Sequence, residues 1–230
     1  MTYVVANLYG RLDKYEKLIK KINLKESDVL YILGNIVDFG EDSIKLVNEL
    51  SAQYNVYTVL GEHDYRAYLL LSEFERIIRE GGAPSTSFSK DMIEWAQNGG
   101  QVTLEAFKDA DADEKEGFLD YLSDLPVFEE VELKNGKEYV LTCRGIDNFD
   151  PNKDLYDYEL EDFMNGYLEM DKTYYNDKFM LVGYLDYEHT PAGRSGKVTA
   201  NNNNIALACD MSENDDVVCV CLETNDEYYV

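Results

Sequence analysis

The amino-acid sequence predicts an α/β fold built on a largely parallel β-sheet. In the first 60 residues, three short runs rich in β-branched residues, "TYVVAN", "DVLYIL" and "YNVYTVL", have the character of buried strands. The segments between them carry apolar residues at helical spacing, and the connections are short. Strands that alternate with helices in this way form βαβ units, in which successive strands pair in parallel.

Helices are expected throughout the first half of the chain. Between the first two strands, one apolar helix face is formed by Leu12, Tyr15, Leu18, Ile19 and Ile22. Between the second and third strands, another is formed by Ile44, Val47 and Leu50. Residues 64–122 contain no convincing strand, and we expect several helices there, broken at "GGAPSTS" and "NGG".

From residue 127 onward the pattern changes mainly to strands. They are expected at "VFEEVEL", "EYVLT", "KFMLVG", "NIALAC", "DVVCVCLE" and "EYYV". Turns are expected at "KNGK" and at the asparagine run 201–204, with a helical or irregular stretch over residues 150–172. No linker, repeat or change of composition divides the chain, so a single domain over residues 1–230 is predicted.

The chain is strongly acidic. It has 46 acidic and 21 basic residues, which give a formal net charge of −25. This much negative potential disfavours direct binding of nucleic acid, anionic lipid and phosphorylated molecules. It favours a basic protein partner or serves solubility alone, and a solvated acidic surface is the simpler interpretation.

The composition also predicts the compartment. No stretch approaches the roughly 18 apolar residues of a membrane span, and the N-terminus lacks the basic start of a signal peptide. We therefore expect a cytoplasmic protein with no membrane segment. The cysteines, Cys143, Cys209, Cys219 and Cys221, form no CxxC pair, so reduced thiols are expected.

Polar loops follow the first three predicted strands. They read "NLYG" (7–10), "GNIVDFG" (34–40) and "GEHD" (61–64). Because α/β folds build their sites at the carboxyl ends of parallel strands, these loops are the place to look for chemistry.

In order and spacing, the three loops resemble the DxHG, GDxxDRG and GNH[DE] motifs of the calcineurin-like metallophosphoesterases, in the branch of the bacterial serine/threonine protein phosphatases. Phrases such as "GRLDKYEKLIKKI", "NGGQVTLEAF" and "YLSDLPVFEEVEL" are also similar to that branch. The likeness continues through "YVLTCRGID", "KFMLVGY" and "NNIALACD", and so covers nearly the whole chain. It implies a sandwich of two mixed β-sheets flanked by helices.

The resemblance also implies a two-metal phosphatase, in which Asp, His and Asn ligands hold two cations and arginines clamp the phosphoryl oxygens. In this chain most of those groups are replaced. The replaced positions are Asn7 and Tyr9 in the first loop, Asn35 and Phe39 in the second, Glu62 in the third, Cys143 at a later His, and Tyr167 near a second Arg. For the last metal His, "KFMLVGY" offers Tyr184 and "EHTP" offers His189; we prefer Tyr184 because the family motif directly follows its strand.

Two functional positions of the family are retained. Asp38 and His63 match its Asp–His dyad, in which the His serves as general acid and the Asp orients it. Without a metal-activated nucleophile the pair cannot perform the family reaction, and a hydrogen-bonded pair that keeps the loop folded is the simpler interpretation. If a single metal binds, Glu62, Cys143 and His189 are the candidate ligands, with Mn, Zn or Fe as the ion.

The leading hypothesis is a catalytically inactive phosphatase-like protein, a pseudophosphatase, that needs no cofactor and binds a protein or a small ligand. Its cleft is expected to be aromatic and polar instead of cationic. The expected lining is Tyr9, Phe39, Tyr65, Tyr167 and Tyr184. The alternatives are a divergent metal-dependent phosphoesterase with a rearranged site, and an acidic mimic of nucleic acid that inhibits a basic protein.

Overall fold

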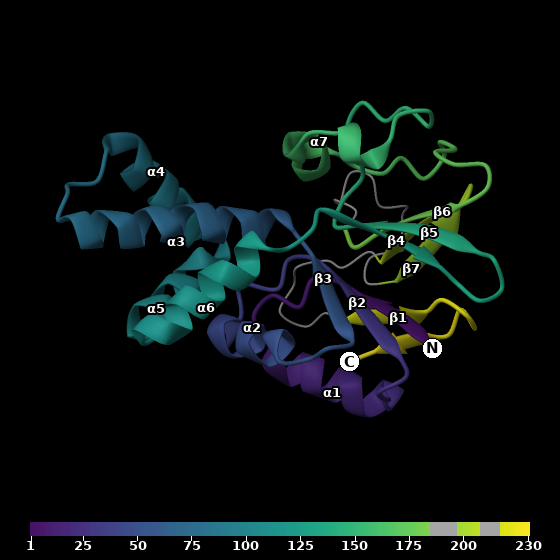
Figure 1. Ribbon diagram of the computed structural model, residues 1–230, viewed down its shortest axis with the longest axis horizontal. Coiled ribbons are helices and arrows are strands. Elements are labelled where there is room, and N and C mark those ends of the chain that lie inside the picture. Colours follow the sequence, from purple (N-terminus) through teal and green to yellow (C-terminus); the bar gives the residue numbers. More distant parts are fainter. Residues whose placement is uncertain (185–196, 208–216) are drawn as a thin grey trace.

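The computed structural model describes residues 1–184, 197–207 and 217–230, and its core is two five-stranded sheets packed face to face (Figure 1). The first sheet has the order β10-β9-β1-β2-β3. Its strands are β1 (Thr2–Val5), β2 (Val29–Leu33), β3 (Val56–Val59), β9 (Val218–Cys221) and β10 (Glu227–Tyr229). Strands β1, β2 and β3 are parallel, as their βαβ connections predict, whereas β9 and β10 are antiparallel to their neighbours.

The second sheet has the order β4-β5-β6-β8-β7. Its strands are β4 (Phe128–Glu132), β5 (Glu138–Thr142), β6 (Phe179–Val182), β7 (Val198–Asn201) and β8 (Asn204–Leu207). The three central strands β5, β6 and β8 are parallel, and the edge strands β4 and β7 are antiparallel to them. Both sheets are therefore mixed, and the predicted fold class is confirmed.

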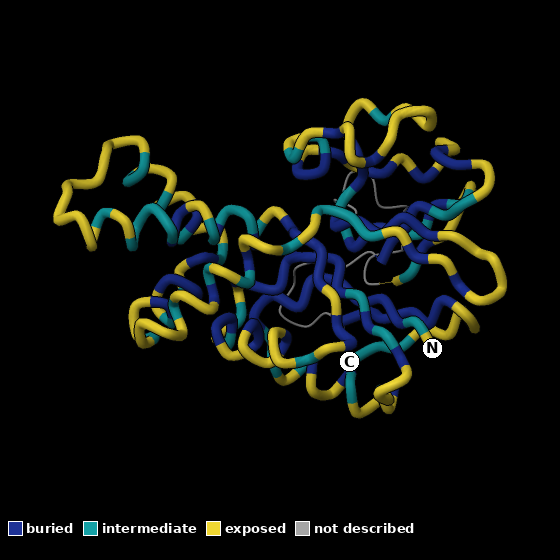
Figure 2. Tube along the Cα trace, viewed as in Figure 1, coloured by how far each residue is buried: buried dark blue, intermediate teal, exposed yellow. Residues whose placement is uncertain are grey.

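Strand alternation divides the core into three layers. Val4, Leu33 and Leu181 point into the space between the two sheets. Their chain neighbours Val5 and Val182 point to the outer faces instead, as the two-residue period of a strand requires. The central strands β1, β5, β6 and β9 are buried on nearly all positions as a result, which explains their largely apolar sequences, whereas the edge strands β4, β7 and β10 are partly exposed (Figure 2).

Helices cover the outer face of each sheet. Helices α1 (Leu12–Ile22) and α2 (Ser43–Ser51) pack their apolar faces on the first sheet, through the residues that the helical spacing selects. The second sheet is covered by the segment around a short 3₁₀ helix, η2 (Leu155–Asp157), and helix α7 (Leu160–Asn165).

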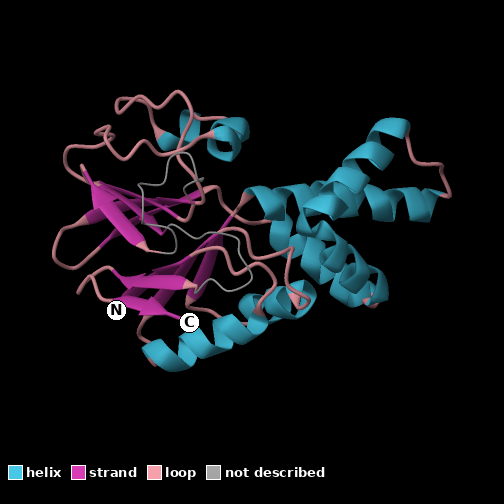
Figure 3. Ribbon diagram, turned by 180° about the vertical axis from the view of Figure 1, so that it is seen from behind, coloured by secondary structure: helices cyan, strands magenta, loops and turns pink. Residues whose placement is uncertain are grey.

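The remaining helices gather to one side of the sheets (Figure 3). They are α3 (Glu62–Glu80), α4 (Thr86–Trp95), α5 (Gln101–Asp109) and α6 (Ala112–Ser123). The predicted break at "GGAPSTS" separates α3 from α4. At "NGG" the helical backbone is interrupted, because Asn98 and Gly99 have non-helical φ and ψ angles; this turn, η1 (Ala96–Gly100), separates α4 from α5, as predicted. No helix in the described ranges is long and apolar enough to cross a membrane.

The asparagine run 201–204 is a hairpin turn, as predicted, but strand β7 before it was not expected. Asn201 pairs with Asn204 across the turn. The amides of all four asparagines donate hydrogen bonds to oxygens of residues 169–176, five of them at backbone carbonyls within 3.4 Å. The asparagine side chains therefore supply hydrogen-bond donors to backbone carbonyls of the irregular segment that precedes β6, and so hold that segment in place.

Candidate functional site

The carboxyl ends of β1, β2 and β3 meet those of β5 and β6 at a cleft of about 400 Å³. The first sheet and the start of α3 contribute most of its floor, and the turn between α4 and α5 forms one wall. The lining residues are Tyr9, Asn35, Phe39, Glu62, His63, Arg66, Trp95, Gln97, Asn98, Arg144 and Tyr184. The loops that the sequence singled out thus form one site.

The first two loops hold several side chains in backbone conformations that L-residues seldom adopt. The φ angles are +57° at Asn7, +46° at Tyr9, +54° at Asn35, +72° at Asp38 and +59° at Phe39. Asparagine and aspartate tolerate this region, but bulky aromatic residues rarely do. Such strain persists only where the surrounding structure imposes it. These loops therefore retain a specialised backbone path.

Asp64 imposes part of that path. One carboxylate oxygen accepts the backbone N–H groups of Asn35 and Gly61 at 2.7 and 2.9 Å. The other accepts the N–H groups of Ile36 and Val37 at 2.8 and 3.3 Å. Asp64 is fully buried, and this burial raises its pKa to about 6 despite the four donors, which act in the opposite direction.

Asn7 and Asn35 form a hydrogen-bonded relay beneath the cleft. Asn7 Nδ2 donates to the carbonyl of Gly183 at 2.9 Å, which links the first sheet to the second. Asn35 Nδ2 donates to Asn7 Oδ1 at 2.9 Å and lies 3.5 Å from the Tyr9 hydroxyl. Asn35 Oδ1 accepts the backbone N–H of His63 at 3.2 Å. In both asparagines, therefore, the Nδ2 donor and the Oδ1 acceptor each have a hydrogen-bond partner.

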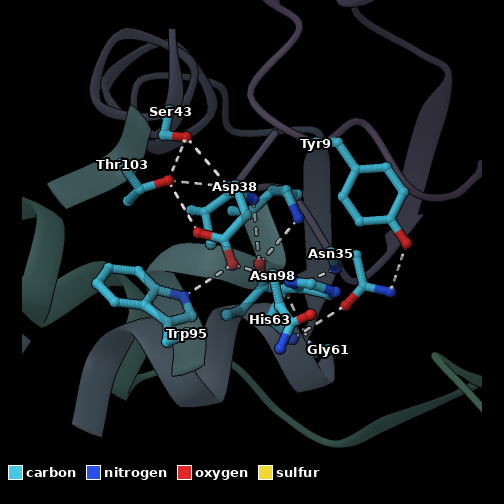
Figure 4. A network of polar contacts seen from close by, with 12 residues as sticks. Tyr9, Asn35, Asp38, Ser43, Gly61, His63, Trp95, Asn98 and Thr103 are labelled. Carbon is cyan, nitrogen blue, oxygen red and sulfur yellow. Dashed lines mark hydrogen bonds and ion pairs between the residues drawn. The ribbon is translucent and has the colours of Figure 1, made fainter. Parts of the chain in front are cut away.

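Asp38 and His63 are in direct contact, with 2.8 Å between His63 Nδ1 and Asp38 Oδ2 (Figure 4). The same oxygen accepts Trp95 Nε1–H at 2.9 Å, and Asp38 Oδ1 accepts the Thr103 hydroxyl at 2.9 Å. Asp38 is completely buried. Because its oxygens face donors, His63 must carry a proton on Nδ1, which leaves Nε2 as its remaining ring nitrogen.

Three rings pack against one another on the cleft floor. Tyr9 meets Phe39 and His63 edge to face, with ring centroids 5.1 and 5.5 Å apart. Phe39 and His63 are 5.2 Å apart in a similar arrangement. Geometries of this kind are favourable for aromatic rings. Phe39 is 40% exposed, so it presents apolar surface to whatever enters.

Two arginines also line the cleft, and the sequence did not predict them there. Arg144 Nη1 donates to Glu62 Oε2 at 2.8 Å, and its guanidinium carbon lies 5.4 Å from the centroid of the Tyr184 ring. Arg66 pairs with Glu94 at 3.1 Å. The cleft is therefore aromatic and polar, as expected, but the expectation that it lacks cations is wrong. Its cations are balanced by neighbouring carboxylates.

The side chains at the cleft do not fit the pair of divalent metals that the family resemblance implies. The amides at positions 7 and 35 are neutral and engaged with each other, and hard divalent cations prefer charged oxygen ligands. Glu62 is paired with Arg144. Cys143 is 2% exposed, and burial raises the pKa of its thiol to about 12, which disfavours the thiolate that metals require. Among the described residues, no three His, Cys, Asp or Glu side chains are grouped to hold a metal ion.

Besides Asn7 and Asp38, which are buried beneath the cleft, the structure places three further predicted residues away from its lining. Cys143 lies behind the second loop, against Gly34. Tyr65 packs on the outer core of the second sheet, and Tyr167 is 45% exposed, with its backbone against Gly145. Tyr184 lines the cleft just after β6, whereas His189 and Cys209 lie outside the described residues.

Sequence reasoning missed most of the wall formed by α4, η1 and α5. Trp95 is the single tryptophan of the chain and immediately precedes the "AQNGG" turn, so its position could have been noticed. Thr103 carries no such signal, because a buried threonine in a helix is unremarkable in sequence. Arg144, which follows Cys143 in the chain, was not predicted at the cleft, and the structure directs its guanidinium to Glu62.

Curated relatives of similar sequence are symmetrical bis(5'-nucleosyl)-tetraphosphatases. The enzyme from Delftia acidovorans is 24% identical over 146 residues, which are 63% of this chain and 44% of the relative. That from Mannheimia succiniciproducens is 35% identical over 77 residues, or 32% and 26% of the two chains. This chain therefore matches less than half the length of these relatives.

Solved structures with the same fold cover the chain almost completely. A proposed diadenosine tetraphosphatase has a TM-score of 0.65 at 17% identity, over 100% of this chain and 92% of its own. A metallophosphoesterase from Sphaerobacter thermophilus has a TM-score of 0.57 at 13% identity, over 100% and 87%. The sequence profile of the calcineurin-like phosphoesterases matches residues 2–220. This chain belongs to the calcineurin-like phosphoesterase family.

Proposed function

We propose that this chain is a pseudophosphatase, a family member that has lost metal-dependent hydrolysis and acts by binding a partner or ligand at the cleft. The observation that carries the proposal is the Asn7–Asn35 relay. Two neutral amides occupy positions at which the family resemblance requires charged ligands; they share one hydrogen bond, and their other polar atoms pair with the Gly183 carbonyl and the His63 backbone N–H. Removing two negative charges strongly weakens a site for a hard divalent cation. We also propose that the chain belongs to the bacterial serine/threonine phosphatase branch, because its motifs follow the order found in that branch.

The test is metal analysis and turnover of the same preparation. Protein purified without chelator is expected to contain no stoichiometric Mn, Zn or Fe. It should not hydrolyse p-nitrophenyl phosphate in added Mn²⁺, because no group of side chains in the described part of the chain supplies the ligands of an activated water. Stoichiometric metal together with turnover that His63→Ala abolishes would overturn the proposal.

A divergent phosphoesterase is the second candidate, and one observation favours it. The Asp38–His63 contact has the geometry of a general acid and its orienting group, with His63 at the cleft surface. This candidate predicts that the protein hydrolyses a phosphoester when Mn, Zn or Fe is supplied. Because the curated relatives are tetraphosphatases, a symmetrical dinucleoside tetraphosphate is the second substrate to assay. Turnover unaffected by His63→Ala would count against this candidate.

For the binding role we propose a protein partner of basic charge. The net charge of −25 and the exposed Phe39 ring support it, because opposite charge accelerates encounter and aromatic residues are enriched in interfaces. A partner isolated from the source cells should bind Phe39→Arg more weakly than wild type. Binding that is unaffected by Phe39→Arg but falls steeply with salt would indicate the acidic mimic instead.

A further inference from the structure

Arg144 places a guanidinium group among positions that the family resemblance assigns to ligands of one cation. Glu62, Cys143 and Tyr184 hold those positions, and Arg144 follows directly after Cys143. Its Nη1 donates to Glu62 Oε2 at 2.8 Å, and its guanidinium carbon lies 5.4 Å from the centroid of the Tyr184 ring. The guanidinium of Arg144 thus contacts Glu62 and Tyr184, which are two of these three side chains.

Arg144 has more hydrogen-bond donors than it has acceptors among the described residues. A guanidinium carries five N–H groups, and the contact with Glu62 uses one of them. The Nε–H of Arg144 is buried and has no hydrogen-bond partner among the described residues. Buried donors are almost always paired, so an acceptor that reaches this nitrogen would gain a hydrogen bond that no described residue makes. Arg144 lines the cleft, where such an acceptor can enter.

Glu62 can be exchanged for that acceptor. Its side chain is 52% exposed, whereas that of Arg144 is 20% exposed. A solvated ion pair of this kind contributes little stability, so the carboxylate can return to water when another anion arrives. A ligand oxyanion can then accept from two nitrogens of the planar guanidinium, which is the geometry that favours arginine over lysine for such groups.

The rest of the cleft suits an oxyanion attached to an apolar ring. His63 uses Nδ1 for Asp38, so Nε2 is the ring nitrogen that faces a ligand, and it donates to an oxyanion only when the imidazole carries a second proton. Arg66, which also lines the cleft, is held by Glu94 in a second half-exposed ion pair. Beside them the exposed Phe39 ring offers an apolar and aromatic contact surface.

We infer that the cleft binds an aryl or apolar oxyanion without a metal ion, with Arg144 as its main cation and Glu62 as an internal competitor. The inference rests on the proposed function, in which the cleft is a binding site. It adds the chemical class of the ligand, a carboxylate or phosphate ester, which the local positive charge of Arg144 binds against the repulsion of the net charge of −25. It also names two residues that set the affinity in opposite directions.

The experiment is calorimetric titration of the full chain after exhaustive EDTA treatment. The probes are phenyl phosphate and benzoate, with inorganic phosphate to assess the contribution of the ring and phenol as the neutral control. Both aryl anions should bind saturably at one site and phenol should not. Arg144→Gln should weaken binding at least about tenfold, as expected for loss of charged hydrogen bonds. Glu62→Gln should tighten it about two- to fivefold, because an exposed competitor is removed.

The matched control is Arg79→Gln, which removes an exposed arginine from α3 outside the cleft and should leave the affinity unchanged. Fluorescence of Trp95 and thermal unfolding establish that each variant is folded. The inference is overturned if neither aryl anion binds at millimolar concentration, if phenol binds equally well, if EDTA abolishes binding, or if Arg144→Gln behaves like Arg79→Gln. Failure to bind anions, with no metal and no turnover, would overturn this inference and leave the pseudophosphatase proposal standing.

Discussion

Asn7 and Asn35 connect loops that lie far apart in the chain, and only amides can make these connections. Each donates through Nδ2 and accepts through Oδ1, so the bonds run from the carbonyl of Gly183 to the backbone N–H of His63. A carboxylate accepts hydrogen bonds but does not donate them when ionised. The residues that remove the metal ligands therefore also provide a cross-link between the two sheets.

The first prediction concerns Asn35→Asp, which restores the carboxylate of the family motif. Asn35 is 4% exposed, and the new oxygen would face Asn7 Oδ1 in place of a donor. Unfolding by urea in the presence of EDTA should show a loss of about 1–3 kcal/mol, the cost of an unsatisfied buried group. Asn48→Asp, on the exposed face of α2, should change little. Equal effects of the two substitutions would show that the relay has no structural role.

The second prediction concerns the pH dependence that Asp64 contributes. Its pKa rises from 3.8 to about 6 on folding because the group is buried, so the folded state binds the proton more tightly than the unfolded state. Its contribution to stability is therefore present below about pH 4 and is lost as the pH rises through about 6. The difference corresponds to about 3 kcal/mol.

Asp64→Asn tests this contribution. The amide cannot titrate, and its NH₂ group would face two of the backbone N–H donors that now bind the carboxylate. The variant should be less stable than wild type at every pH, but its stability should fall less between pH 4 and pH 7. Urea unfolding of both proteins across that range measures the difference in slope. Parallel profiles would contradict the prediction.

At the scale of elements, the turn between α4 and α5 positions the second loop. Trp95 ends α4 and Thr103 lies in α5, and both donate to Asp38 across the turn η1. The backbone carbonyl of Gly99 also accepts the N–H of Phe39 at 2.9 Å. The orientation of His63 thus depends on a helix junction about 35 residues away in sequence, since His63 itself contacts Asp38.

The third prediction compares two glycines within the helical region. A Cβ at Gly100 would lie 2.2 Å from the Trp95 ring, whereas a Cβ at Gly117 in α6 meets nothing within 4 Å. Gly100→Ala should destabilise the protein by about 1–3 kcal/mol, as overpacking does, and should alter the fluorescence of the single tryptophan. Gly117→Ala should stabilise it by about 0.5–1 kcal/mol through helix propensity, without changing the fluorescence. If both substitutions changed the free energy of unfolding in the same direction, the steric explanation would be rejected.

At the scale of the whole molecule, the acidic surface opposes the compact state. A net charge of −25 on a chain of 230 residues implies repulsion that folding increases by bringing the charges together. Three apolar layers, one between the sheets and one on the outer face of each sheet, supply the hydrophobic burial that overcomes this repulsion.

The fourth prediction follows from this repulsion. Raising NaCl from about 0.01 M to about 0.5 M shortens the Debye length from about 30 Å to a few Å. The free energy of unfolding at pH 7, measured with urea, should therefore increase. Near the isoelectric pH of 4.3 the same change in salt should have almost no effect. An increase of equal size at both pH values would show that the salt acts other than by screening net charge.

Much of the fold could be predicted because hydrophobic period and length identify an element locally. The parallel strands β1, β2 and β3 and the apolar faces of α1 and α2 were predicted in this way. Strand β7 was missed because it is short and two of its four residues are exposed, so its sequence lacks an apolar run. The break at residues 96–100 was predicted because glycines interrupt the helical pattern, and the non-helical backbone of Asn98 and Gly99 confirms it.

By itself, the sequence determined the α/β class and the polar loops at the strand ends, and both depend on residue identity and local order alone. Its resemblance to the family further predicts that charged and cationic groups are replaced at Asn7, Asn35 and Phe39. Only the tertiary structure decided how those side chains are satisfied: Asn7 with Gly183, Asp38 with Trp95 and Thr103, and Glu62 with Arg144. Such pairs lie 57 to 176 residues apart, and their formation depends on sheet packing that no local pattern encodes.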